Sequence, residues 1–327
     1  MIKILKDKYI SQVNWNRNAN WNSTVNGSVT TVSTNGGPSY YGTYDQSGNV
    51  WELIDNPQNT EKILRGGSWS CGDLYTISSS YRKKISIYDT DLDVGVRLCT
   101  SSPDENDWTT WIKIGDPSNI PDDTLLGSYG SVTYDFYIQK YPVTNDEYAF
   151  FLNIVDPYGN NALELYSPLM GLEVQGGIIF NPFNKIGAKY ICKPYMNNKP
   201  VVNINWIRAA RLCNWLHQGI HTESTTENGV YEINQALTTK SIDGKFWIPL
   251  EDEWYKAAFF DAHKEENGAY WKYATQNDIT PNPVTNVDFY GNGPCSVSSI
   301  IPESIIQPGL QPLFNDYITE TLTDLLD

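Results

Sequence analysis

The sequence is poor in histidine, in cysteine and in long apolar runs, and each shortage excludes a class of protein. Three histidines leave almost no room for an iron site with three histidine ligands. The five cysteines are odd in number and none is in CxxC spacing, which argues against a disulfide framework and a zinc knuckle. No stretch approaches the ~20 apolar residues that a membrane-spanning helix needs. We therefore expect no membrane partner.

Basic residues are also few. The chain has 38 acidic and 23 basic side chains, a formal net charge of −15 and an isoelectric point near 4.6. Such a surface repels phosphate backbones, so we expect no nucleic-acid partner. Acidic side chains attract cations or basic proteins, although solubility alone also explains them.

The start of the chain, residues 1–13, lacks an apolar run long enough for a signal peptide. We therefore expect an intracellular protein, in which the sequons at Asn22 and Asn26 have no role. The richness in Asn, Ile and Tyr is typical of AT-rich genomes. A component of a larger assembly, such as a virion, is one hypothesis consistent with that composition.

What the chain does contain predicts a globular, loop-rich fold. Hydrophobic residues make up 40% and charged residues 19%, which is typical of a chain with a packed core. The 11 tryptophans and 22 tyrosines supply flat side chains that pack between irregular segments. Residues 1–100 resemble turns and short strands, which we expect over residues 27–32 and 94–98.

Helices are predicted in the second part of the chain, after a connector. The sequence from Thr144 to Glu147 is a capping box ahead of an apolar helical pattern. A second helix is expected from Asn205 to His217, ending at Gly219, with Cys213 in the core. A third is expected after Pro249, with acidic residues in its first turn. In the connector, Trp108, Trp111 and Ile112 are the side chains expected to be buried.

Several short motifs carry a family resemblance. They lie at residues 41–52, 64–69, 94–98, 140–148, 200–206, 209–216 and 247–258. Together they resemble the formylglycine-generating enzymes, also called sulfatase-modifying factors. The resemblance implies an α+β fold: one mostly irregular domain related to the C-type lectins.

The order of the motifs is reversed relative to that family. Residues 18–99 resemble its C-terminal half and residues 127–292 its N-terminal half, with residues 100–126 as connector. Residues 18–21 and 286–289 both resemble the element that normally joins the halves. We interpret residues 1–292 as one circularly permuted domain and residues 293–327 as an acidic tail. Alternatively, the halves pair between chains in a swapped oligomer, and the tail is either a docking helix or a helix packed on its own domain.

The resemblance implies a copper site, and one ligand of that site is missing. Family enzymes follow the RGGS motif with two cysteines, five residues apart, whose soft thiolates bind copper(I). Here Cys71 keeps the first position, beside Ser68, and Thr76 occupies the second. A hydroxyl cannot replace a thiolate, so we expect weak copper binding. Cys71 is then a remnant ligand, a reactive thiol or a residue without a role. Completion of the pair by Cys99 or Cys295 has no support from their spacing.

The resemblance also implies a calcium site in the turn that precedes Trp51. By position, its ligands are the Asp45 side chain, the carbonyls of Gly48 and Val50, and Glu52. The alternative is a hydrogen-bonded turn without metal, anchored by Trp51. A second family calcium site would use Asn20 and Trp21.

Two histidines form the remaining metal candidate. His217 and His221 are four residues apart, but Gly219 lies between them, so two surface histidines are the simpler interpretation.

Two functions follow from these observations. The first is a non-catalytic binding or structural module with a protein, peptide or glycan ligand near Ser68, Trp69 and Cys71. The second is a copper-dependent oxidase that converts a substrate cysteine to formylglycine.

Overall fold

A computed structural model describes residues 11–20, 26–56, 61–104, 109–219, 226–233 and 240–293. Its helices are α1 (Asn145–Val155), α2 (Leu169–Leu172), α3 (Trp206–Gln218), α4 (Glu251–Phe259) and the 3-10 turn η1 (Leu74–Ile77). Its strands are β1 (Gln12–Val13), β2 (Trp51–Ile54), β3 (Glu61–Arg65), β4 (Lys83–Ser86), β5 (Val94–Gly95), β6 (Cys99–Thr100), β7 (Trp111–Ile114), β8 (Asp122–Thr124), β9 (Gly127–Tyr129), β10 (Phe136–Gln139), β11 (Ile178–Phe180), β12 (Tyr190–Cys192), β13 (Phe246–Trp247), β14 (Phe260–Asp261), β15 (Ala269–Tyr270) and β16 (Asn282–Pro283). The α+β fold class expected from the sequence is confirmed.

Two four-stranded sheets organise the described residues. One has the order β4-β3-β2-β5, and the other has the order β13-β6-β10-β7. The second sheet joins β6, at the end of the first half, to β10 and β13 of the second half. The parallel pair β1–β16 also joins the two ends of the described chain. Both halves thus pack against each other within one chain, while circular permutation stays our interpretation of the motif order.

The helices form where local sequence favours them. Thr144 accepts a hydrogen bond from the Glu147 amide and Glu147 accepts one from the Thr144 amide, which is the predicted capping box of α1. Asn205 caps α3, and Gly219 follows its last turn with a φ of 102°. The acidic first turn of α4 is also as predicted.

The strand predictions were less accurate. Residues 27–32 form no strand, because the amide of Thr30 bonds to the Asn49 side chain and Gly27 has a φ of 88°. The strand expected over residues 94–98 is limited to β5. The connector is more structured than expected: it contributes β7, whose Ile114 is fully buried, and the β8 strand. Trp111 and Ile112 are half-buried, and Trp108 lies outside the described residues.

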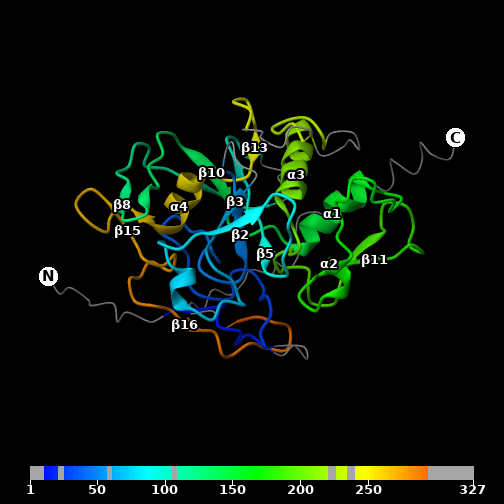
Figure 1. Cartoon of the computed structure of the whole chain (residues 1–327), viewed down its shortest axis with the longest axis horizontal. Coiled ribbons are helices and arrows are strands. Elements are labelled where there is room, and N and C mark those ends of the chain that lie inside the picture. Colours follow the sequence, from blue (N-terminus) through cyan, green and yellow to red (C-terminus); the bar gives the residue numbers. More distant parts are fainter. Residues whose placement is uncertain are drawn as a thin grey trace.

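The main core fills the space between the two sheets, α1 and α3. It includes Leu53 from β2, Ile138 from β10, Phe151 from α1 and Trp215 from α3. Cys213 of α3 is in the core as predicted. Figure 1 shows α1, α2 and β11 on one side of the molecule and α4, β8 and β15 on the other, with β2 and β3 between them. The aromatic side chains thus bridge many short elements, as the composition indicated.

Several predictions fall on residues outside the described part. They concern Trp21, His221, Cys295 and the acidic tail from residue 294 onward. Among the described residues, no helix has the length and apolar character needed to cross a membrane.

Candidate functional site

Motifs from the two halves of the chain meet at a buried ion pair. Glu52 and Arg97 are both fully buried, and two Arg97 nitrogens bond to the two Glu52 oxygens at 2.8 and 2.7 Å. The indole of Trp254 donates to Glu52 Oε2 at 2.6 Å. Arg97 also donates to the carbonyls of Tyr44, Gln139 and Lys140. The pair ties four of the family-like motifs together, those at residues 41–52, 94–98, 140–148 and 247–258.

A second ion pair repeats this pattern. Arg65 of the RGGSW motif donates to Glu251, in the first turn of α4, at 2.8 Å. The Gln46 side chain donates to the Trp254 carbonyl at 3.3 Å. These motif residues join the halves, because Trp254, Lys140 and Glu251 of the second half bond to Glu52, Arg97 and Arg65 of the first.

The Cys71 loop is closed, and its hydroxyls and thiol bond to neighbouring groups, while Trp69 Nε1 and Asp93 Oδ1 are buried without a hydrogen-bond partner. The thiol of Cys71 accepts from the Ser68 amide at 3.3 Å and lies 3.4 Å from the Ser68 hydroxyl. Ser68 is fully buried, and Trp69 and Cys71 are nearly so. The groove expected at Ser68, Trp69 and Cys71 is therefore not formed by these side chains.

Asp93 is the residue of this loop region that the sequence reasoning missed. Its Oδ2 accepts hydrogen bonds from the hydroxyls of Ser68 and Ser70, at 2.6 and 2.5 Å. Burial raises the pKa of Asp93, and the two hydroxyls oppose that shift. The available signal was its position immediately before the 94–98 motif, which the sequence analysis used only for family recognition.

The hydroxyl of Thr76 is engaged with the backbone and cannot act as a thiolate ligand. It lies in η1, and its hydroxyl donates to the Asp73 carbonyl at 2.5 Å. The described cysteines form no disulfide, and Cys99 and Cys213 are fully buried on β6 and α3. Cys192 has an aspartate, Asp146, as its neighbour at 4.0 Å. One thiol beside hydroxyls and a carboxylate is a donor set that does not fit copper(I).

The Asp45 turn has the oxygen donors that calcium prefers. Asp45 is buried and accepts from the Ser33 amide at 2.7 Å. Neither the Gly48 nor the Val50 carbonyl accepts a hydrogen bond from another described backbone amide outside the regular strands. Gly48 is required here, because a Cβ would lie 2.6 Å from the Asn14 carbonyl oxygen.

The charge balance of that turn also favours a cation. Burial raises the pKa of Asp45 to about 7, and the nearby Glu52 carboxylate contributes to the rise. Glu52 Oε2 accepts from both Arg97 and Trp254, so Oε1, which accepts from Arg97 alone, is the oxygen that keeps a further lone pair. Asp45, Oε1 of Glu52 and the two carbonyls are oxygen donors of the kind that calcium takes in proteins.

Two other residues expected as metal ligands, Asn20 and His217, accept hydrogen bonds from backbone amides. Asn20 Oδ1 accepts from the Gly27 amide at 2.8 Å. His217 Nδ1 accepts from the Lys245 amide at 3.1 Å, which places this histidine in a structural role. Within the described ranges, no group of three or more His, Cys, Asp and Glu side chains is arranged to hold a metal.

Comparison with known families agrees with these motif contacts. A family model described as sulfatase-modifying factor enzyme 1-like domain matches residues 5–102 and 128–297. The chain belongs to this family. No curated protein and no solved structure shows significant similarity to it. The two matched segments contain the Glu52–Arg97 and Arg65–Glu251 ion pairs, so in this family member the recognisable sequence includes residues that hold the fold.

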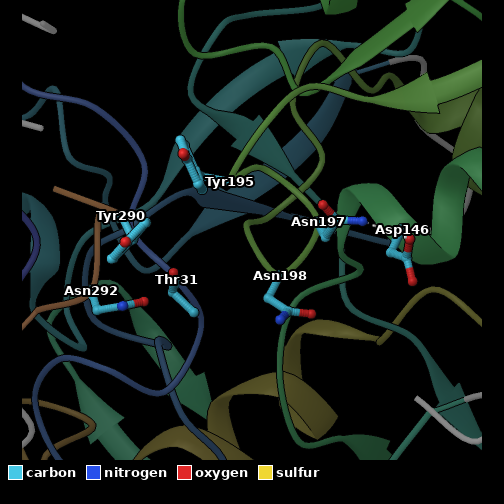
Figure 2. Close-up of a pocket in the computed structure, with 7 residues that line it drawn as sticks. All are labelled: Thr31, Asp146, Tyr195, Asn197, Asn198, Tyr290 and Asn292. Carbon is cyan, nitrogen blue, oxygen red and sulfur yellow. Dashed lines mark hydrogen bonds between the residues drawn. The ribbon is translucent and has the colours of Figure 1, made fainter. Parts of the chain in front are cut away.

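A cavity of about 360 Å³ lies away from the Cys71 loop residues. It is lined by Thr31, Asp146, Tyr195, Asn197, Asn198, Tyr290 and Asn292 (Figure 2). None of these was a candidate in the sequence analysis, since they come from loops that the family-like motifs mostly leave out.

Proposed function

We propose that this member of the sulfatase-modifying factor family is a non-catalytic binding or structural module without copper chemistry. The observation that carries the proposal is Thr76, whose hydroxyl donates to a backbone carbonyl where the family pattern has a thiol. Copper(I) selects soft sulfur ligands, and a neutral hydroxyl is a hard one.

The environment of Cys71 supports the same proposal. Its thiol is nearly buried and is held by the amide and hydroxyl of Ser68. Ser68 is in turn bonded to Asp93. A substrate cysteine would have to displace these mutual contacts to reach the sulfur.

The module would also bind calcium at the Asp45 turn, through Asp45, Glu52 and the carbonyls of Gly48 and Val50. A bound calcium ion supplies positive charge to a buried pair of carboxylates. Its role there is structural, since Glu52 also anchors Arg97 and Trp254.

We also propose where the module acts and what it binds. An intracellular protein, or a component of a larger assembly, would use this fold to hold a protein, peptide or glycan. Self-association through exchanged halves or through the acidic tail is the corresponding route to an oligomer.

Copper(I) retention tests the proposal directly. The purified chain, the Thr76→Cys variant and the Cys71→Ser variant would each compete with a chromogenic copper(I) chelator in the absence of oxygen. We expect no retained copper in the wild type or in Cys71→Ser, and one equivalent per chain in Thr76→Cys, because that substitution restores a pair of thiolates.

The opposite result would support the copper-dependent oxidase. If the wild type retains one equivalent and Cys71→Ser does not, a second thiol must reach Cys71. A cysteine-containing peptide, followed by mass spectrometry, would then report whether the thiol is oxidised to an aldehyde.

A further inference from the structure

The cavity at Tyr195 and Tyr290 is assembled from segments that are far apart in the sequence. Thr31 comes from the first half, residues 195–198 precede a motif of the second half, and residues 290–292 come near the end of the described chain. Asp146 adds the first turn of α1. Figure 2 shows Tyr195 and Tyr290 toward one side, Asp146 on the other, and Asn197 and Asn198 between them.

Buried hydrogen bonds hold these segments in place. The Thr31 amide donates to the Gly291 carbonyl at 2.9 Å, and the Val32 amide donates to the Asn198 carbonyl at 3.0 Å. The ammonium of Lys199, a buried residue, donates to Thr31 Oγ1 at 3.0 Å and to the carbonyls of Tyr195 and Tyr290 at 2.7 and 2.6 Å. The cavity is therefore preformed, and a ligand need not order it.

Three aromatic side chains form a surface beside the cavity, which we call the aromatic platform: Tyr195, Phe289 and Tyr290. Their rings are 45%, 60% and 52% exposed. Each pair packs edge to face, with centroid separations of 5.0 to 5.7 Å. The rings touch one another, so no gap remains between them for an ammonium group, as an aromatic cage would require.

The polar lining is rich in amides and poor in charge. Of the seven lining residues, Asp146 alone is charged, and its Oδ1 accepts from the Asn197 side chain at 3.1 Å. Asn197, Asn198 and Asn292 carry amides, which have both donors and acceptors. The lining has no cationic side chain to attract a phosphate or a carboxylate. This combination matches hydroxyl groups, which also donate and accept.

We propose that this cavity binds a neutral glycan. A sugar ring has an apolar C–H face that packs on an aromatic ring and a rim of hydroxyls that bond to amides. The volume of about 360 Å³ lies within the range of small-ligand pockets. The site shares no residue with the Cys71 loop or the Asp45 turn, so it is independent of the copper question.

The test starts from an array of neutral and acidic glycans probed with the full chain. The strongest neutral ligand is then titrated by calorimetry into the wild type and into Tyr290→Ala and Asn198→Ala. We expect each variant to bind roughly three- to tenfold more weakly, the range that corresponds to one lost aromatic contact or hydrogen bond. Asn198 is a useful second position, since its side chain is exposed and lines the cavity.

Controls separate a lost contact from a lost fold. Tyr88→Ala removes a tyrosine that is 64% exposed and does not line the cavity, and it should bind as the wild type does. Tyr290→Phe keeps the ring and should retain most of the affinity. The proposal is overturned if the array retains no neutral glycan, if both alanine variants bind like the wild type, or if choline displaces the sugar. None of these outcomes alters the copper measurement, so the two proposals fail separately.

Discussion

The Cys71 loop and the Tyr195–Tyr290 cavity use their polar groups in opposite ways. In the loop, the hydroxyls of Ser68 and Ser70 are both bonded to Asp93. In the cavity, exposed amides and half-exposed rings surround a volume of about 360 Å³. In the loop, the hydroxyls and the thiol bond to buried neighbours, whereas the cavity presents the exposed Asn198 side chain and the rings of Tyr195 and Tyr290 to a ligand. The loop and the cavity both lie in segments that the family model matches, so they differ in the packing of their polar groups and not in family similarity.

The largest effect on the free energy of unfolding is expected from a substitution at Arg97. The Arg97→Ala variant leaves Glu52 buried without its partner, so the free energy of unfolding should fall by about 3–5 kcal/mol. Urea denaturation followed by tryptophan fluorescence would measure the change.

Lys84→Ala is the matched control for that variant. It breaks the ion pair with Glu61, in which both side chains are more than half exposed, and such pairs contribute little. Equal losses in the two variants would contradict the view that the motif residues hold the halves together.

A smaller effect on stability is expected from the titration of Asp45 and from calcium binding at its turn. The pKa of Asp45 is raised to about 7 in the folded state from its ordinary value of 3.8. The folded state then binds more protons than the unfolded state between these values, so stability should fall as pH rises from about 4 to 7. Calcium at one hundred times its dissociation constant should raise stability at pH 7 by about 2.7 kcal/mol.

The Asp45→Asn variant tests both parts of that prediction. Its stability should depend less on pH, and a calcium chelator should change its thermal midpoint less than that of the wild type. Scanning calorimetry with and without calcium would measure both. A wild type that is insensitive to calcium at pH 7 would leave the Asp45 turn as a hydrogen-bonded turn without metal.

Much of the fold was predictable because local rules determine it. The capping box at Thr144 and the Asn205 and Gly219 boundaries of α3 depend on neighbouring residues and were predicted correctly. The strand expected over residues 27–32 failed, because a tertiary contact from the Asn49 side chain takes the Thr30 amide. Local patterns do not contain that contact.

The candidate site was less predictable for the same reason. Cys71 and Ser68 were found through a motif, and Asp93, which bonds to Ser68 across 25 positions of sequence, was not. The aromatic platform unites residues 195 and 289–290, which only the folded chain brings together. The motifs identified the family, and they contain little of the loops that line the cavity.

The smallest expected effect on stability is that of Lys199, which bonds to three residues that line the cavity. Burial lowers the pKa of Lys199 to about 8, and its ammonium bonds to Thr31, Tyr195 and Tyr290. Lys199→Met keeps the length of the side chain but leaves carbonyls without a donor, which should cost about 1–3 kcal/mol of folding free energy. Glycan affinity should fall as well, although no lining side chain has changed. If urea denaturation shows the loss in stability while calorimetry shows unchanged affinity, the cavity does not depend on this buried anchor, and the aromatic platform alone must account for binding.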